Sequence, residues 1–322
     1  MSNILVTGGA GFIGSFLCER LIGQDNSVAL LDNLSTGSKA NTAGFITKGN
    51  AVFHMGSILD EALLEDCIAS TDIVYHMAAS VGVKYVVENP LISITTNTRG
   101  TENVLKLCAL HGKKVFIASS SEVYGKSSEL PFREDGNLVF GSTHISRWSY
   151  ACSKVLDEFL SLAYFRKEGL DVRVGRLFNI CGPRQTGAYG MVIPRFVTQA
   201  LAGDPITVYG DGTQKRSFTS VHNAVSYIIA LTEHEQTAGE IYNIGSGNSI
   251  SIGELAAKIR EMTGSRSEIV YIPYEETYEK GFEDIQDRIP DISKLQAVCP
   301  DITPLSLDSV LGKTIEYHRG NI

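Results

Sequence analysis

The sequence predicts an α/β protein built on a doubly wound parallel sheet, with a smaller mixed lobe in its C-terminal part. Six short runs of β-branched and apolar residues recur up to residue 180, and stretches with helical spacing separate them. The runs are continuously apolar rather than alternating, which is typical of strands buried on both faces. Such alternation of strands and helices places helices on both sides of a parallel sheet.

The elements follow one another regularly in the first half of the chain. The predicted strands are residues 3–8, 27–33, 51–55, 72–79, 113–119 and 171–180. After them, glycine, proline and polar residues become more frequent, so an irregular second lobe is expected to begin near CGPRQTGAYG at 181–190. No internal repeat or low-complexity linker is visible, so we expect the two lobes to pack as one unit.

Composition and charge point to a globular protein with small-molecule partners. The chain has 322 residues, of which 43% are hydrophobic and 20% are charged. Its net charge of -8 comes from 28 Lys and Arg against 36 Asp and Glu, spread along the chain without a basic cluster. Nucleic acid and anionic lipid are therefore not the expected partners.

Cysteine usage and the N-terminal segment predict a reduced, cytoplasmic protein without a metal site. The cysteines show no Cys-x-x-Cys spacing, so neither a zinc site nor a disulfide framework is indicated. No basic-then-apolar leader precedes MSNILVTGG, and no run reaches the roughly 18 apolar residues of a membrane span. The six cysteines are Cys18, Cys67, Cys108, Cys152, Cys181 and Cys299.

A glycine-rich turn follows the first predicted strand and opens a helix. Gly8, Gly11 and Gly14 have the spacing that allows a tight turn, close approach of backbone N–H groups to a pyrophosphate, and close packing of the helix. Asp32 ends the next strand, where a carboxylate accepts hydrogen bonds from an adenosine ribose. A 2′-phosphate would be repelled there, so we predict a Rossmann-like sheet that binds NAD.

Polar side chains stand at the end of the fifth predicted strand. SSSEVYG, residues 119–125, directly follows the apolar run VFIA. Ligands bind outside the carboxyl ends of parallel strands, so these hydroxyls and the Glu122 carboxylate are predicted to face a substrate. From the residues alone, a role that only caps the loop, instead of facing the substrate, stays open for Ser119 and Ser121 and is less favoured for Ser120.

Of the thirteen tyrosines, only Tyr150 has a lysine four residues later, Lys154. On a helix these positions share a face, so the ammonium can lie beside the phenol. A phenol with a pKa near ~10 is a poor base at neutral pH, but a nearby cation favours the phenolate. Taken alone, the pair is as consistent with an accidental contact on the surface of a helix as with a catalytic role. Together with the glycine turn and the hydroxyl-rich strand end, it predicts a catalytic base.

Five segments in this order carry a family resemblance: TGGAGFIG, SSSEVYG, YACSK, RLFNICGPRQ and VYGDGTQKRSFTSV. They resemble an extended short-chain dehydrogenase/reductase of the nucleotide-sugar epimerase, dehydratase and decarboxylase group, over essentially the whole chain. The resemblance implies that Tyr150 is the base, Lys154 its activator and ribose ligand, and Ser120 the hydroxyl that bonds the oxidised sugar oxygen. It also implies recycled NAD, a UDP-sugar substrate, and a homodimer formed through helices near residues 98–112 and 150–167.

The same resemblance implies further contacts with the cofactor. Asn97 matches the helix asparagine of the family, and Ile58 carries over although Ser57 replaces a common adenine-contacting Asp. Asn223 also replaces a common Asp, and we expect it to cap the following helix. The other implied cofactor residues are Phe12, Ile13, Asn33, Ala78, Ala79 and Ser119.

Fixed cations are needed for the nucleotide end of such a substrate, because guanidinium groups bind phosphate well. Arg184 and Arg195 are as consistent with surface or interlobe pairs as with ligand contacts. The resemblance divides the chain into an NAD-binding domain at 1–178, with a later contribution from about 215–245, and a nucleotide-sugar lobe at 179–322. The implied substrate contacts are Lys84, Tyr85, Asn179, Tyr209, Arg216 and Arg288.

Transient oxidation at sugar C4 is common to this group, and three outcomes stay open afterwards. The C4 ketone acidifies the C5 proton, so that a 6-hydroxyl can be eliminated. It turns a C6 carboxylate into a β-keto acid, which loses CO2. If the ring turns over, hydride returns to the other face and inverts C4. From a different class, a non-catalytic NAD-binding sensor is an alternative.

Glu122 favours decarboxylation of UDP-glucuronate among these outcomes. Plain 4-epimerases of the family usually have a small or hydroxyl residue there, whereas dehydratases and glucuronate decarboxylases have Glu, a credible proton carrier. Ser121 replaces the Asp of many dehydratases. Arg147 and Trp148, with GFEDIQDRIPDI around Arg288, resemble bacterial UDP-glucuronate decarboxylases.

Two other reactions stay open. The first alternative is 4-epimerisation of a UDP-hexose or UDP-uronate, and the second is 4,6-dehydration. A Glu122 that caps the next turn or pairs with Lys126 also stays open.

Overall fold

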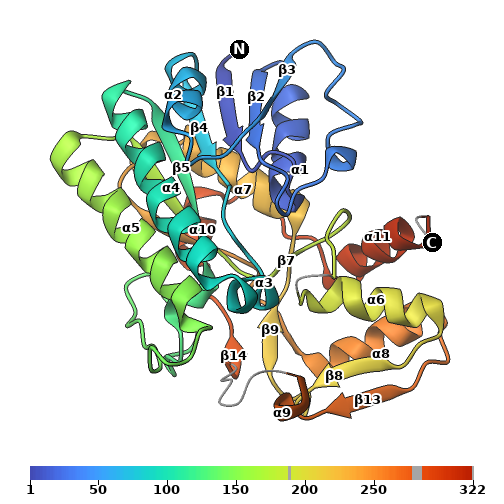
Figure 1. Cartoon of the computed structure of the whole chain (residues 1–322). Helices are drawn as coiled ribbons and strands as arrows, with labels where there is room; N and C mark the ends of the chain where they lie inside the picture. Colours follow the sequence, from blue (N-terminus) through green and yellow to red (C-terminus); the bar gives the residue numbers. More distant parts are fainter. Residues whose placement is uncertain (188–189, 278–284, 321–322) are drawn as a thin grey trace.

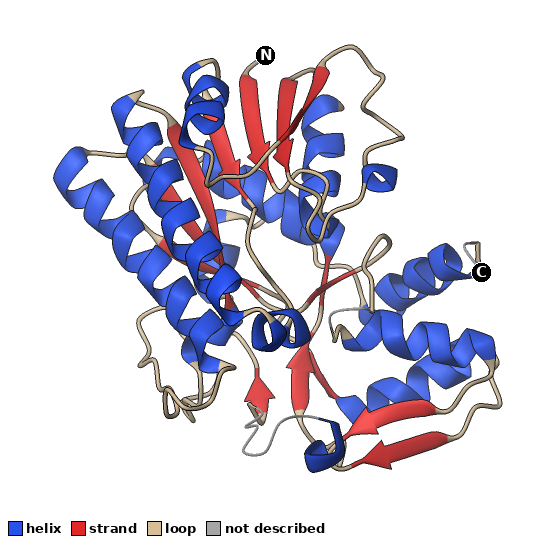
Figure 2. Cartoon of the chain, in the orientation of Figure 1, coloured by secondary structure: helices blue, strands red, loops and turns tan. Residues whose placement is uncertain are grey.

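The computed structural model describes residues 1–187, 190–277 and 285–320, without the side chains of residues 83, 84, 275 and 277. A seven-stranded sheet lies at its centre, in the order β11-β6-β5-β4-β1-β2-β3 (Figures 1 and 2). Every neighbouring pair in it runs parallel. The predicted fold class is therefore confirmed. The strands are β1 (Asn3–Thr7), β2 (Ser27–Asp32), β3 (Ala51–Met55), β4 (Ile73–His76), β5 (Lys114–Ser120), β6 (Val172–Leu177) and β11 (Ile241–Ile244).

Helices cover both faces of the sheet, because successive strand residues point to opposite sides. On β1, Ile4 and Val6 pack with α1 and α7, whereas Leu5 packs on the other face with α2 and α4. Both clusters are buried, as expected for strands without a polar face. The helices of this lobe are α1 (Phe12–Ile22), α2 (Glu61–Ala69), α3 (Val83–Glu88), α4 (Pro90–Leu110), α5 (Trp148–Glu168), α7 (Val221–Glu233) and α10 (Ser293–Val298). Short 3-10 turns are η1 (Lys39–Asn41), η2 (Ser121–Tyr124) and η3 (Glu235–Thr237).

The second lobe has its own apolar core, formed by α6, α8 and α11 against the strand β8. It lies beside the carboxyl ends of the central strands (Figure 1). Its helices are α6 (Val192–Ala202), α8 (Ile252–Thr263), α9 (Tyr274–Thr277) and α11 (Leu307–Arg319). The short strands outside the central sheet are β7 (Ile180–Cys181), β8 (Ile206–Tyr209), β9 (Lys215–Ser217), β10 (Thr219–Ser220), β12 (Ser249–Ser251), β13 (Ile269–Ile272) and β14 (Asp287–Arg288).

The two lobes are joined by polar contacts at the start of the second lobe. Arg184 donates to Glu19 at 2.6 Å and to Ser15 at 3.3 Å, and its guanidinium lies 4.3 Å from the ring centre of Phe16. All three partners lie on α1. Of the two alternatives for Arg184, the structure therefore shows the interlobe pair.

Two local expectations are wrong, and each has a geometric reason. The run 171–180 is not one strand: Asn179 adopts a φ of 36°, which ends β6 and sets β7 apart. Asn223 does not cap α7, which begins at Val221 with Ser220 as its N-cap. Its side chain instead donates to the carbonyl of Thr303 and accepts from another backbone N–H of the same C-terminal segment. In the described part of the chain, no helix is long and apolar enough to cross a bilayer.

Candidate active site

A cavity of about 510 Å³ opens at the carboxyl edge of the central sheet, with walls from both lobes. Most residues that the sequence assigns to the site line it, although they are far apart in the chain. Asn97 lies behind the cavity wall, and the side chain of Lys84 is outside the described residues. The predicted residues that line the cavity are Gly8, Gly11, Phe12, Ile13, Gly14, Asp32, Asn33, Ile58, Ala78, Ala79, Tyr85, Ser119, Ser120, Ser121, Glu122, Tyr150, Lys154, Asn179, Tyr209, Arg216 and Arg288.

The glycine turn between β1 and α1 leaves no room for side chains. Gly8 has a φ of 70°, and a Cβ added there would lie 2.8 Å from the backbone nitrogen of Ala78. A Cβ on Gly14 would collide with the carbonyl oxygen of Gly8, so α1 can approach the turn only because Gly14 has no side chain. The first N–H groups of α1 therefore face the cavity unobstructed, which suits a pyrophosphate.

Asp32 ends β2 beside this turn and is only 8% exposed. Its Oδ2 accepts the N–H of Ala10 at 2.9 Å, and its Oδ1 accepts the N–H of Leu34 at 2.7 Å. Each carboxylate oxygen can accept a further hydrogen bond, so ribose hydroxyls can still bind. The turn and this carboxylate together fit a dinucleotide with an unmodified ribose, as the sequence predicts.

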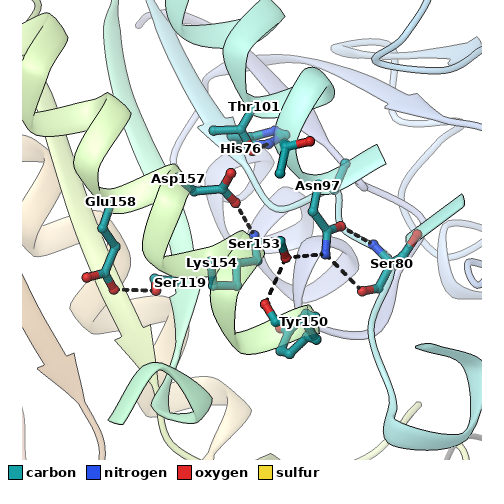
Figure 3. Close-up of polar contacts among 12 residues, drawn as sticks. His76, Ser80, Asn97, Thr101, Ser119, Tyr150, Ser153, Lys154, Asp157 and Glu158 are labelled. Carbon is teal, nitrogen blue, oxygen red and sulfur yellow. Dashed lines mark hydrogen bonds and ion pairs between the residues drawn. The ribbon is translucent and has the colours of Figure 1, made fainter. Parts of the chain in front are cut away.

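Tyr150 lies in the first turn of α5, and Lys154 lies one turn later on the same side (Figure 3). Burial raises the pKa of Tyr150 above its ordinary value, while the Lys154 ammonium and the Ser120 hydroxyl oppose that rise. The carboxylates of Glu122 and Asp157 reinforce it. The predicted effect of Lys154 is therefore present, but burial outweighs it.

The three consecutive hydroxyls at the end of β5 have different surroundings. Ser120 accepts the backbone N–H of Glu122 at 3.2 Å, so it caps η2, and its hydroxyl also lowers the pKa of Tyr150. Ser119 donates to Glu158 at 2.5 Å. Ser121 is 2% exposed and lines the cavity wall. Capping and a place beside the base are thus combined in one residue, Ser120.

Glu122 lies between two guanidinium groups. Its Oε2 accepts from Arg147 at 3.4 Å, and its Oε1 accepts from Arg288. Arg288 is the register partner of Arg216 on the neighbouring strand, so a third guanidinium is held next to it. Trp148 is buried with its ring 5.7 Å from the Arg147 guanidinium. This side of the cavity therefore combines one carboxylate with a wall of fixed cations.

Asn97 links three segments instead of lining the cavity (Figure 3). Its Oδ1 accepts the N–H of Ser80 at 2.8 Å, and its Nδ2 donates to Ser153 at 3.2 Å. Ser153 in turn donates to the carbonyl of Tyr150 at 2.8 Å. The amide thereby fixes the loop after β4 to the start of α5, where the tyrosine lies.

The far end of the cavity carries an aromatic and a cationic side chain in contact. Arg195, which the sequence left open, lines the cavity with its guanidinium 3.9 Å from the ring centre of Tyr209. A stacked guanidinium and phenol provide a flat surface for a planar ring.

Asn179 donates from Nδ2 to the carbonyl of Ser217 at 2.8 Å, and its φ of 36° is one that asparagine tolerates.

Sequence reasoning misses several residues of the site. Asp157 pairs with Lys154 at 3.1 Å. The sequence contains a signal for this pair, because Asp157 lies three residues after Lys154 on the same helix. Further residues line the cavity from both lobes without any local pattern that marks them. Among those of the second lobe are Gln185, Gln214, Phe218 and Tyr274.

Comparisons with known proteins agree with this geometry. Residues 4–245 match the model of the NAD dependent epimerase/dehydratase family. The chain belongs to that family. It is therefore an NAD-dependent enzyme of the epimerase, dehydratase and decarboxylase type, and the predicted resemblance is confirmed.

Individual relatives match over nearly the whole chain. A UDP-N-acetyl-alpha-D-glucosaminuronate decarboxylase of Bacillus cytotoxicus is 44% identical over 98% of this chain and 97% of its own. A UDP-glucuronic acid decarboxylase 1 of Xenopus tropicalis is 34% identical over 98% of this chain and 72% of its own. The crystal structure of UDP-glucose 4-epimerase from Thermotoga maritima with UDP-glucose has a TM-score of 0.89 at 30% identity, covering 99% of both chains.

Proposed function

We propose that this enzyme decarboxylates a UDP-linked hexuronate through a transient 4-keto sugar. The observation that carries the proposal is Glu122 held between Arg147 and Arg288 in the cavity that contains Tyr150. Guanidinium groups are the side chains best suited to carboxylate and diphosphate, and a uronate sugar nucleotide has both. The 44% identical relative named for decarboxylation of such a sugar supports this choice.

Each residue has a defined part in this reaction. Tyr150 accepts the proton of the C4 hydroxyl, whose oxygen is bonded by Ser120. The glycine turn and Asp32 would hold NAD, which would supply the hydride acceptor for C4 oxidation and the hydride donor for the final reduction. In the resulting β-keto acid the C5–C6 bond breaks, CO2 leaves, and the electron pair remains on the sugar as an enolate. Glu122 carries the proton that C5 then receives.

The nucleotide is assigned to the second lobe. Arg216 and Arg288 are proposed to bind the diphosphate, Tyr209 with Arg195 the nucleobase, and Tyr85, Asn179 and the undescribed Lys84 side chain the sugar or phosphate region. NAD is assigned to the first lobe, residues 1–178 with the later segment from about 215–245, and the sugar nucleotide to 179–322. Residues from both ranges line the same cavity, which supports this assignment.

A second candidate is 4-epimerisation of a UDP-sugar. The observation in its favour is the TM-score of 0.89 to a UDP-glucose 4-epimerase, which shares the arrangement of both lobes. Epimerisation needs the same proton transfer at C4 but no proton carrier at C5. The carboxylate of Glu122 would then have no chemical part, which is why decarboxylation is preferred.

One product assay separates these reactions. The purified protein is incubated with UDP-glucuronate, UDP-N-acetylglucosaminuronate, UDP-glucose and UDP-N-acetylglucosamine, and products are identified by mass and proton NMR. Loss of one CO2 from a uronate is expected. An unchanged mass with inverted C4, or loss of water, from any of these sugars without decarboxylation would replace the proposal.

We also propose a homodimer formed through α4 and α5 and a cytoplasmic location. The two helices lie side by side on the surface (Figure 1) and expose apolar side chains: Leu91 and Ile94 on α4, Leu156 and Phe159 on α5. Phe159→Glu is expected to give a monomer in light scattering, whereas Val52→Glu, which changes an exposed apolar residue on the edge strand β3, leaves the wild-type mass. A dimer that survives Phe159→Glu would contradict this interface.

The cysteines support the proposed cytoplasmic location. Five of the six thiols are buried and none is in a disulfide, as expected in a reducing compartment.

A further inference from the structure

A buried carboxylate that the reaction does not require faces the lysine beside the base. Asp157 has no exposed surface, Lys154 is 2% exposed, and Asp157 Oδ2 lies 3.1 Å from Lys154 Nζ. Figure 3 shows the carboxylate and the ammonium pointing at each other on the side away from Tyr150. An ammonium at this depth requires a counter-charge, because an unpaired buried ion costs several kcal/mol.

Other acids near Lys154 are already engaged elsewhere. Glu158, the residue after Asp157, accepts from Nε and Nη2 of Arg176, at 2.9 and 2.7 Å, and from the Ser119 hydroxyl. Glu122 is held by its two arginines, Arg147 and Arg288. Asp157 is thus the carboxylate that the helix places against Lys154, at the i, i+3 spacing.

Behind Asp157 the surroundings are polar but carry no charge. Burial raises the pKa of the Asp157 carboxyl, while the Lys154 ammonium and the Thr101 hydroxyl oppose that rise. The Thr101 hydroxyl lies 3.1 Å from Nε2 of His76, whose Nδ1 lies 2.8 Å from the Thr7 hydroxyl. Burial lowers the pKa of His76 to about 3, so this imidazole is neutral at any working pH. The charge of Asp157 is therefore balanced by Lys154.

We infer that Asp157 is a positioning residue that tethers the Lys154 ammonium and, by offsetting its charge, sets the pH at which Tyr150 becomes a base. The inference rests on the proposed role of Tyr150. Two effects of opposite sign follow from one carboxylate. It holds the ammonium in place through a hydrogen bond, and its negative charge disfavours the nearby phenolate.

The charged and titratable groups around the Tyr150 and Lys154 pair come from several elements. Asp157 contacts Lys154 directly, and its negative charge also raises the pKa of Tyr150. Among the residues that the structure describes, these groups are Lys154, Asp157 and Glu158 on α5, Glu122 on η2 with its partners Arg147 and Arg288, Arg176 on β6, and His76 on β4.

Asp157→Asn tests the inference because it keeps the shape and a hydrogen-bond acceptor but removes the charge. Without the negative charge the phenolate is favoured, so the acid limb of the kcat/KM profile is expected to move about one pH unit lower. The titration of Tyr150 in the NAD-bound protein, followed by NMR of 13Cζ-labelled tyrosine and assigned with Tyr150→Phe, should move equally. Glu168→Gln makes the same charge change at the exposed end of α5 and should move neither.

The NMR titration requires no substrate, so a wrong choice of sugar leaves this test intact. If the midpoint of the Tyr150 titration is the same in Asp157→Asn as in the wild-type protein, the charge of Asp157 has no effect on the tyrosine, and the inference is overturned. If that variant does not fold, the 13Cγ signal of Asp157 in the wild-type protein decides. An ionised carboxylate at pH 7 is expected, and a protonated one would equally overturn the inference.

Discussion

The two ends of the cavity are built in different ways. At the NAD end, the binding surface is backbone: the turn at Gly8 to Gly14 and the first N–H groups of α1. Asp32 lies 22 residues after Ala10, and its carboxylate accepts the Ala10 N–H. At the sugar end, the site is made of side chains from remote segments, and Glu122 meets Arg288 across 166 residues. Local sequence specifies the first, whereas long-range packing specifies the second.

This difference has a chemical consequence. The pyrophosphate of NAD is the same whichever sugar is bound, so a fixed set of backbone N–H groups can bind it in enzymes that act on different sugars. The fate of the 4-keto sugar depends on which side chain reaches C5 or C6, and single substitutions can change it. Mutations at the two ends should therefore affect different measured quantities.

The largest effect is expected at the base that both ends share. Tyr150→Phe removes the proton acceptor and should lower kcat about 10³-fold, while the affinity for NAD changes little. Turnover is followed by product mass, and NAD binding by calorimetry. Tyr164→Phe on the same helix is the control and should keep full activity. Wild-type turnover in Tyr150→Phe would disprove the proposed mechanism.

A smaller effect is expected at the sugar end. Glu122→Gln keeps the size of the side chain but cannot carry a proton, so decarboxylation should fall about 10²-fold. Oxidation at C4 should persist, visible as reduced NAD by absorbance. The comparison variant is Glu129→Gln, an exposed loop acid hydrogen-bonded to Asn137, with no expected change. Full product yield from Glu122→Gln would remove that residue from the reaction.

The smallest effect concerns the backbone cradle and should appear in stability and cofactor affinity. Gly14→Ala pushes a Cβ into the Gly8 carbonyl and should destabilise the fold by about 1–3 kcal/mol, with weaker NAD binding. Gly312→Ala on α11 meets open space and should stabilise it by about 0.5–1 kcal/mol. Thermal unfolding with and without NAD measures both. Equal shifts in the two variants would mean that close packing at Gly14 is unimportant.

The sequence predicts six of the seven central strands because each is a continuous apolar run. The seventh, β11, comes after a scattered stretch and joins β6 only through a long crossover. Asn223 shows the limit of local reasoning: its side chain could cap a helix, but α7 begins two residues earlier, and the amide binds a distant backbone segment instead. Capping depends on where a helix begins, and tertiary packing decides that.

By itself, the sequence determined the parallel α/β fold, the glycine turn with Asp32, and the Tyr150 and Lys154 pair. These depend on spacing within one strand or helix, where chain geometry alone fixes which side chains meet. Only the tertiary structure decided that Glu122 is held by two arginines, that Asn97 supports α5 from behind the cavity, and that Asp157 balances Lys154 in the interior. The contacts of Glu122 and Asn97 depend on the meeting of distant segments. The i, i+3 spacing places Asp157 near Lys154, but their burial, which makes the ion pair necessary, depends on tertiary packing.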